Sequence, residues 1–177
     1  MDSNLSKPIR FSFNTFKDKR GFFAELFNND RYKKIKKINF KQINIVKSKK
    51  NVLRGMHYQV KKPIGYLITI VEGKILDITV DIRVNSNGFK KVYAYELSKG
   101  DQLFIPPGFA HGYVCLSKSS LMTYFCTETY DPKDEFGFNY DDPLINKLWP
   151  NNKFLIKSRD KNFLLLKNIE LNNMPQL

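Results

Sequence analysis

The chain has little cysteine and little histidine. Among its 177 residues there are two cysteines, Cys115 and Cys126, and two histidines. Two cysteines in a chain of this length do not form a disulfide framework, and both lie in apolar, strand-like surroundings, so we expect reduced thiols. Two histidines exclude any site that needs three imidazole ligands.

Long apolar runs are also absent. No stretch approaches the ~18 apolar residues that a membrane span requires, and residues 1–13 contain neither a continuous apolar core nor a small-residue cleavage site. We therefore expect a soluble, cytoplasmic protein with no membrane partner.

Arginine is scarce although the chain is basic. Thirty basic and 17 acidic residues give a net charge of +13, yet only six of the basic residues are arginine. The lysine runs stand beside many Asn and Ile residues, which is typical of a compositional bias and a solvated face. Because no nucleic-acid-binding motif accompanies the charge, we predict no nucleic-acid partner. An electrostatic benefit for an anionic small-molecule substrate remains open.

What the chain does contain is β pattern. Fifteen Phe and nine Tyr accompany short segments that alternate between apolar and polar residues. The predicted strands cover 9–13, 43–48, 66–71, 74–84, 91–97, 102–105, 112–116 and 121–127. Helical pattern is confined to 30–36 and 143–148, and the last residues are expected to fray. We predict one all-β domain over 1–177, a sandwich or barrel with a few short helices.

The two histidines are the first candidate functional residues. His57 and His111 each lie beside apolar residues, where a histidine is commonly a hydrogen-bonded core residue. Each also has a glycine within two residues, Gly55 and Gly112, where backbone can approach a ligand closely. Both fall on strand-like segments of one small β domain, so a common cavity is the functional alternative.

The spacing of Gly100, Pro106, Gly108 and His111 resembles the second signature of the cupin jelly-roll barrels. Metal-binding cupins supply two further histidines and a glutamate from an earlier signature, whereas the earlier segment here offers only His57. Two histidines without a third ligand make a poor site for zinc or iron, so we predict no metal.

Several motifs, in their order and spacing, resemble the dTDP-4-dehydrorhamnose 3,5-epimerase family, whose members are cupin-type nucleotide-sugar epimerases. The likeness runs through most of the chain, at 16–25, 42–44, 53–59, 80–83, 105–112, 130–132, 142–143, 149–150 and 158–160.

The resemblance implies a cofactor-independent isomerase whose substrate is a nucleoside-diphosphate 4-keto-6-deoxy sugar on the way to a cell-surface glycan. Carbons 3 and 5 flank the ketone, so their protons are acidified, and epimerisation needs a base and an acid on opposite faces. By resemblance His57 is the base, Asp160 orients its ring, and Tyr130 is the opposite-face acid. From the residues alone, Tyr130 could equally be an aromatic over the barrel rim and Asp160 a surface turn residue.

The resemblance also implies a substrate pocket and a homodimer. Arg20 and Arg54 match positions that grip the diphosphate, to which guanidinium presents a planar charged fork. The family positions that line the nucleotide or sugar pocket are matched by Glu25, Gln42, Asn44 and His111. In the family the N-terminal segment crosses to a neighbouring subunit, so Arg20 would serve the partner's site. Solvated strand-end charge is the alternative for both arginines.

Three positions depart from the family pattern. Tyr66 stands where lysine usually follows the glycine and is thought to steady the enolate; a phenol donates a hydrogen bond without full charge. Tyr140 and Asp141 stand where Trp and Asn are common in the family. The identity of the nucleotide base therefore follows less firmly from the resemblance than the type of reaction does. The alternatives are epimerisation at one carbon only, another nucleotide such as a GDP-linked sugar, or a non-catalytic sugar-nucleotide-binding cupin.

Overall fold

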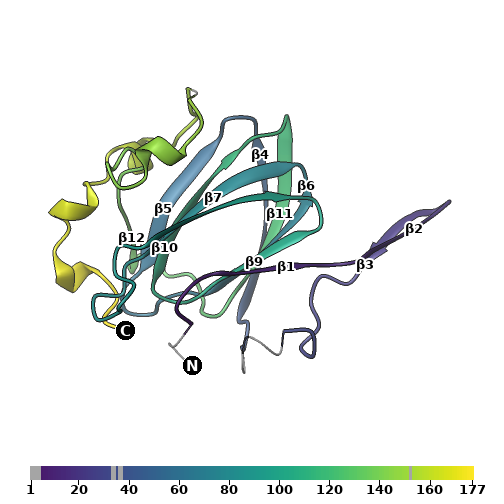
Figure 1. Cartoon of the computed structure of the whole chain (residues 1–177), viewed down its shortest axis with the longest axis horizontal. Coiled ribbons are helices and arrows are strands. Elements are labelled where there is room, and N and C mark those ends of the chain that lie inside the picture. The colour runs from purple at the N-terminus through teal and green to yellow at the C-terminus, as the bar shows by residue number, and fades with distance from the viewer. Residues whose placement is uncertain (1–4, 33–34, 36–37, 152) are drawn as a thin grey trace.

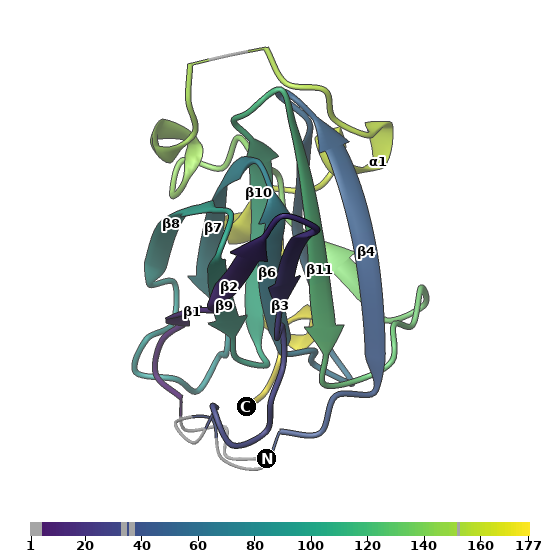
Figure 2. The same ribbon diagram turned by 90° about the vertical axis from the view of Figure 1, so that its right-hand side faces the viewer.

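Two antiparallel sheets of five strands each form the body of the protein, and a separate hairpin projects from it (Figures 1 and 2). The computed structural model describes residues 5–32, 35, 38–151 and 153–177. The first sheet has the order β1 (Ile9–Ser12), β9 (Asp101–Ile105), β6 (Tyr66–Glu72), β11 (Ser119–Cys126), β4 (Gln42–Lys49). The second has the order β12 (Glu135–Gly137), β5 (Leu53–Gln59), β10 (Phe109–Cys115), β7 (Lys74–Asp81), β8 (Val92–Ser98).

The all-β prediction is confirmed, since the layered sheets are the jelly-roll barrel of the cupins. Each predicted strand is present within a few residues of its expected bounds. The hairpin of β2 (Thr15–Asp18) and β3 (Gly21–Ala24) and the short strand β12 were missed, and β5 was expected only as a strand-like segment around His57, without bounds. Of the expected helix at 30–36, residues 33, 34 and 36 lie outside the described residues, and Asp30–Tyr32 form turns. The expected helix at 143–148 is a single 3-10 turn, Asn146–Leu148.

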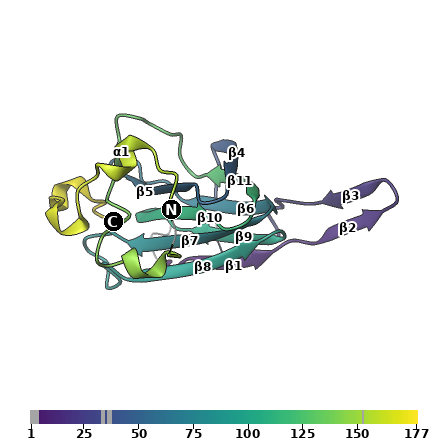
Figure 3. The same ribbon diagram turned by 90° about the horizontal axis from the view of Figure 1, so that it is seen from above.

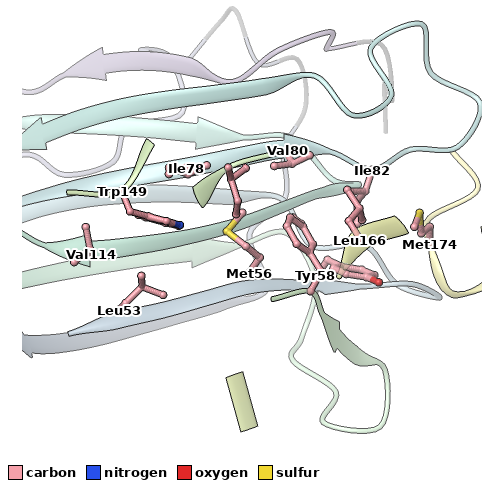
Figure 4. Close-up of a cluster of buried hydrophobic side chains, with 13 residues drawn as sticks. Leu53, Met56, Tyr58, Ile78, Val80, Ile82, Val114, Trp149, Leu166 and Met174 are labelled. Atoms are coloured by element: carbon pink, nitrogen blue, oxygen red, sulfur yellow. The ribbon is translucent and has the colours of Figure 1, made fainter. Parts of the chain in front are cut away.

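Alternation along the strands divides the apolar side chains between the inside of the barrel and its outer faces. One cluster fills the space between the sheets, with Ile68, Ile105 and Phe109 among its buried members. A second covers the outer face of β5, β10 and β7, where Met56 and Ile78 are fully buried (Figure 4). Burial of one such side chain contributes roughly 1.5–3 kcal/mol before entropy is counted, so the strands are held on both faces.

The C-terminal segment covers that outer face. It contains α1 (Ser158–Lys161) and two 3-10 turns, Leu166–Asn168 and Leu171–Asn173. Leu166 and Met174 join the cluster shown in Figure 4, and the carbonyl of Pro175 accepts a hydrogen bond from the amide of Val84 at 3.1 Å. The prediction that the last residues fray was therefore wrong, because apolar burial holds the segment almost to its end.

The β2–β3 hairpin points away from the barrel (Figures 1 and 3). It carries Phe16, Phe22 and Phe23, which are 61%, 53% and 67% exposed. The outward side chains of the edge strand β4, Ile43 and Ile45, are 62% and 69% exposed. The projecting hairpin and the edge strand thus expose large apolar side chains, which is unusual for the surface of a monomer.

Among the described residues, none of the helices has the length and apolar character needed to cross a bilayer.

Candidate active site

A cavity of about 540 Å³ opens within the barrel, between the two sheets. Successive side chains of a strand point to opposite faces, so every second residue of β4, β6, β10 and β11 lines it. The lining residues are therefore spaced by two: Gln42, Asn44 and Val46 on β4, Tyr66 and Ile68 on β6, His111 and Tyr113 on β10, and Met122, Tyr124 and Cys126 on β11. Eight of the ten predicted site residues lie here, namely Gln42, Asn44, Arg54, His57, Tyr66, His111, Tyr130 and Asp160.

His57 lies on β5 beside a buried carboxylate from the C-terminal segment. Its Nε2 is 3.0 Å from Oδ1 of Asp160, and the Asp160 side chain is only 4% exposed. Burial works against ionisation of Asp160, but hydrogen bonds and charge from His57, with those from Arg159 and the amide of Gly55, outweigh it and lower the pKa of this carboxyl. Asp160 is thus an ionised partner that can hold the imidazole in one orientation.

A second imidazole–carboxylate pair lies in the same cavity. His111 on β10 is the direct cross-strand neighbour of His57. Its Nδ1 is 3.1 Å from Oδ2 of Asp77, which is fully buried on β7 and also accepts the hydroxyl of Thr79 at 2.9 Å. In the neutral ring the hydrogen then lies on Nδ1, and Nε2 carries a lone pair that can accept a hydrogen bond.

Gly55 and Gly112, the glycines beside the histidines, allow two strands to approach each other closely. They were expected to let backbone approach a ligand, but neither is among the residues that line the cavity. A Cβ added at Gly55, which has φ +122°, would lie 2.4 Å from Cα of Gly112. Only glycine at both positions lets β5 and β10 approach this closely. The close approach places His57 and His111 side by side.

Tyr130 follows β11 and reaches the cavity from a loop. Its amide donates to Oε1 of Gln42 at 2.9 Å, and its hydroxyl donates to Oε2 of Glu135 at 3.0 Å. Desolvation and the Glu135 carboxylate raise the pKa of the phenol, while Arg159 acts in the opposite direction. The phenol is thus neutral at ordinary pH, as a proton donor must be.

Both the oxygen and the nitrogen of the Gln42 side-chain amide form hydrogen bonds within the protein. Besides holding Tyr130, it donates through Nε2 to Oδ1 of Asn44 at 3.0 Å. Asn44 in turn donates to the Cys126 sulfur at 3.7 Å. Gln42 lines the cavity as predicted, and its polar atoms support the loop of Tyr130.

Tyr66 forms part of the cavity wall between the sheets. Its ring lies 4.8 Å from the ring of His111 and 6.1 Å from that of Tyr124. Burial first, and then nearby thiol, phenol and carboxylate groups, raise the pKa of Tyr66. At the family's lysine position this chain therefore presents a neutral hydroxyl.

Cys126 is a buried free thiol on the same wall. Burial raises its pKa to about 11, and the hydrogen bond from Asn44 offsets only part of that effect. A protonated thiol is a poor nucleophile, so Cys126 acts here as a wall residue.

Cations line one part of the cavity. Arg54 on β5 donates to the hydroxyl of Ser48 at 3.4 Å, and Lys157 and Arg159 come from the C-terminal segment. Arg159 is paired with Glu135 and Asp160, so Arg54 and Lys157 are the two cations that favour an anionic ligand such as a diphosphate.

Arg20 and Glu25 lie outside the cavity of their own chain. The side chain of Arg20 is 84% exposed on the projecting hairpin and pairs with Asp18 at 2.6 Å. Glu25 pairs with Arg31. Their predicted role in substrate binding thus requires a second subunit.

Tyr140 and Asp141 also do not line the cavity. The ring of Tyr140 packs edge-on against Phe154 at 6.2 Å, and its carbonyl accepts the indole N–H of Trp149 at 2.9 Å. The amide of Asp141 donates to Oδ1 of Asn139. These substitutions belong to the packing of the C-terminal segment.

Four site residues were missed from the sequence: Asp77, Glu135, Lys157 and Arg159. Asp77 had a usable signal, since a carboxylate in the middle of an apolar strand needs a partner inside the barrel. Glu135 and Arg159 form an ion pair between loops far apart in sequence, and no local pattern indicates such a pair. In the part of the chain that the structure describes, no three acidic, histidine or cysteine side chains gather in a metal-binding arrangement.

The chain is similar to known proteins of one family. The family model described as dTDP-4-dehydrorhamnose 3,5-epimerase matches residues 2–168. A dTDP-4-dehydrorhamnose 3,5-epimerase of Methanothermobacter thermautotrophicus is 37% identical, covering 91% of this chain and 90% of that protein. A dTDP-4-dehydrorhamnose 3-epimerase of Streptomyces niveus is 30% identical over 84% of this chain and 74% of its own length.

Among solved structures, the dTDP-6-deoxy-D-glucose-3,5-epimerase of Legionella pneumophila, in complex with dTDP-4-keto-L-rhamnose, superposes with a TM-score of 0.90. It is 34% identical, and the match covers 98% of this chain and 95% of that one. With a jelly-roll barrel and a histidine–aspartate pair in its cavity, this chain belongs to the dTDP-4-dehydrorhamnose 3,5-epimerase family and is an isomerase.

Proposed function

We propose that this protein epimerises C3 and C5 of a nucleoside-diphosphate 4-keto-6-deoxy sugar, with dTDP-4-dehydro-6-deoxyglucose as the substrate. The observation that carries the proposal is the meeting of the His57–Asp160 pair and the Tyr130 phenol in one cavity. A cytoplasmic step in the synthesis of a cell-surface deoxysugar is the setting that fits this reaction.

In the proposed reaction His57 takes the proton from the carbon beside the ketone. Asp160 accepts the hydrogen on Nε2, so the Nδ1 lone pair is the base. The electron pair of the broken C–H bond moves into the carbonyl and forms an enolate. Tyr130 then donates its hydroxyl proton to the same carbon from the other face, and the electron pair returns from oxygen. Phenolate and imidazolium exchange protons with solvent before the next step.

The enolate oxygen needs a hydrogen-bond donor in place of the missing lysine. Tyr66 lies on the wall with its ring 4.8 Å from that of His111, and its hydroxyl suits this role. Arg54, Lys157 and Asn44 are placed to bind the nucleotide diphosphate.

The active form we propose is a homodimer that exchanges its β2–β3 hairpins. The exposed phenylalanines of the hairpin and the outward Ile43 and Ile45 of β4 would be covered in it, and Arg20 would reach the partner's cavity. Sedimentation velocity tests this: a monomer at micromolar concentration would contradict it.

The reaction itself is tested in heavy water with a small panel of nucleotide 4-keto sugars, followed by nuclear magnetic resonance. The expected result is deuterium at C3 and C5 of the dTDP sugar, with inversion at both carbons. Binding without exchange, by correctly folded protein, would indicate a non-catalytic sugar-nucleotide-binding protein. Exchange only with a GDP-linked sugar would correct the nucleotide.

Tyr66 motivates the second candidate, epimerisation at one carbon only, because a neutral donor replaces the family's charged one. If its hydroxyl steadies the enolate, Tyr66→Phe loses one hydrogen bond worth ~1–3 kcal/mol, and kcat falls about tenfold to a hundredfold. KM should change little, because the bond strengthens only as charge develops.

Tyr66→Lys is the companion variant for regiochemistry. A change in the ratio of C3 to C5 exchange would support the single-carbon candidate. If neither variant alters the rate or the ratio, Tyr66 has no part in either candidate.

A further inference from the structure

Five side chains form an unbroken run of contacts beside the cavity, from His57 to Tyr130. The link at the His57 end is Asp160, whose Oδ1 lies 3.0 Å from Nε2 of His57 and 3.1 Å from Nε of Arg159; at the other end Nη1 of Arg159 pairs with Oε2 of Glu135. The hydroxyl of Tyr130 donates to that same Oε2 at 3.0 Å. The ion pair of Glu135 and Arg159 thus connects the proposed base to the proposed acid.

We propose that Glu135 and Arg159 are positioning residues: Glu135 holds the Tyr130 phenol, and Arg159 holds the His57–Asp160 pair and balances the Glu135 charge. The proposal rests on the function proposed above, since it assigns the means by which acid and base are kept at opposite sides of one sugar.

The two residues are themselves well anchored. Glu135 begins β12, where it pairs with Gln59 of β5, and its side chain is 13% exposed. Arg159 lies in α1, and its Nε donates to Oδ1 of Asp160 at 3.1 Å. Both sit on elements that contact β5, the strand of His57.

Tyr130 needs such an anchor. The residue is 46% exposed and lies on a loop, so a phenol without a partner would rotate freely. Gln42 fixes its backbone and Glu135 fixes its hydroxyl. Two fixed points define the direction of the ring, which proton transfer requires.

Charge gives the pair a second effect. The Glu135 carboxylate favours the neutral phenol, because a phenolate beside it would be repelled. The Arg159 guanidinium favours the phenolate that remains after proton transfer. Glu135 and Arg159 therefore act on the phenol in opposite directions, and the pair keeps it able both to give and to regain its proton.

Other titratable groups face the same space from neighbouring elements. They are Arg54 and His57 on β5, Tyr66 on β6, His111 and Tyr113 on β10, Tyr124 and Cys126 on β11, Lys157 before α1, and Asp160 on α1. These stay unchanged in the variants below, so a difference between variants reports on the Glu135–Arg159 pair.

The experiment compares Glu135→Gln with Arg159→Gln. The pKa of Tyr130 is measured by ultraviolet titration of tyrosinate, as the difference between each protein and the same protein carrying Tyr130→Phe. We expect Glu135→Gln to lower the pKa of Tyr130, because the carboxylate is lost and the guanidinium stays. Arg159→Gln should raise it, because the carboxylate then acts unopposed.

Turnover provides the second readout. The alkaline limb of the pH–rate profile should move to lower pH in Glu135→Gln and to higher pH in Arg159→Gln. In Glu135→Gln, kcat should fall about tenfold, a part of the roughly 10²- to 10⁴-fold that a positioned acid contributes, while KM changes less than about threefold. Glu96→Gln is the matched control, since Glu96 pairs with Lys74 away from the cavity and should change neither readout.

Opposite shifts in the two variants support the proposal, because loss of structure alone would not move one group in two directions. Unchanged titration of Tyr130, or shifts of the same sign, would overturn it. If circular dichroism shows that one variant is unfolded, the direction in which the pKa of Tyr130 shifts in the other variant decides whether the proposal holds. The titration needs no substrate, so its outcome stands apart from the heavy-water test of the proposed function.

Discussion

The His57→Asn protein should lose epimerase activity by about 10³-fold or more, with no deuterium entering C3 or C5. Asparagine cannot take up the sugar proton, and a positioned base contributes roughly 10²- to 10⁴-fold. Because Asp160 is ionised and almost fully buried, the variant also leaves that carboxylate without its imidazole partner. The loss should therefore lie in kcat, measured by isotope exchange under saturating substrate.

Binding of dTDP is the control for this variant. Arg54, Lys157 and Asn44 are unchanged, so calorimetry should give a dissociation constant within about threefold of the unaltered protein. Exchange that persists at both carbons within about tenfold of the original rate would remove His57 as the base.

Tyr130→Phe should separate proton removal from inversion. Without the phenol, no proton returns from the opposite face, so product formation should fall about 10²-fold or more. His57 can still remove a proton and return a solvent deuteron to the same face. We expect deuterium to enter the unreacted sugar faster than inverted product appears.

The measurement follows deuterium in the substrate pool and in the product during one time course. The ring packing changes little in this variant, because the hydroxyl contacts Glu135 and the backbone is held by Gln42. If exchange and inversion fell equally, Tyr130 would also be needed for proton removal, and the role of Tyr130 as the proton-returning acid alone would be wrong.

Much of the barrel could be predicted because its strands obey one rule. Alternation with a period of two predicted the strands and, through them, a shared cavity for His57 and His111, which lie opposite each other across β5 and β10. The hairpin at 15–24 escaped the same rule, because three phenylalanines on it face solvent in the single chain. Alternation predicts only those strands whose apolar side is covered within the chain.

The contacts that complete the site could not be predicted from local sequence pattern, because they join residues far apart in the chain. Arg159 meets Glu135 across a sequence separation of 24 residues, and His57 meets Asp160 across more than a hundred. Motif resemblance pointed to Asp160. Arg159 stood in the same motif without a role, and Glu135 lay outside every motif that carried the resemblance. The substrate-binding roles of Arg20 and Glu25 stay predictions, because the groups that they would contact would belong to a second subunit.

The account depends on an imidazole and a phenol that approach one sugar ring from opposite sides. A crystal structure with the dTDP sugar that carries a hydroxyl in place of the ketone would test this most directly, because that ligand has no acidified proton and cannot react. We predict His57 and Tyr130 on opposite faces of the pyranose, each within about 4 Å of C3 or C5. A sugar bound with both side chains on one face, or outside the cavity, would contradict the account.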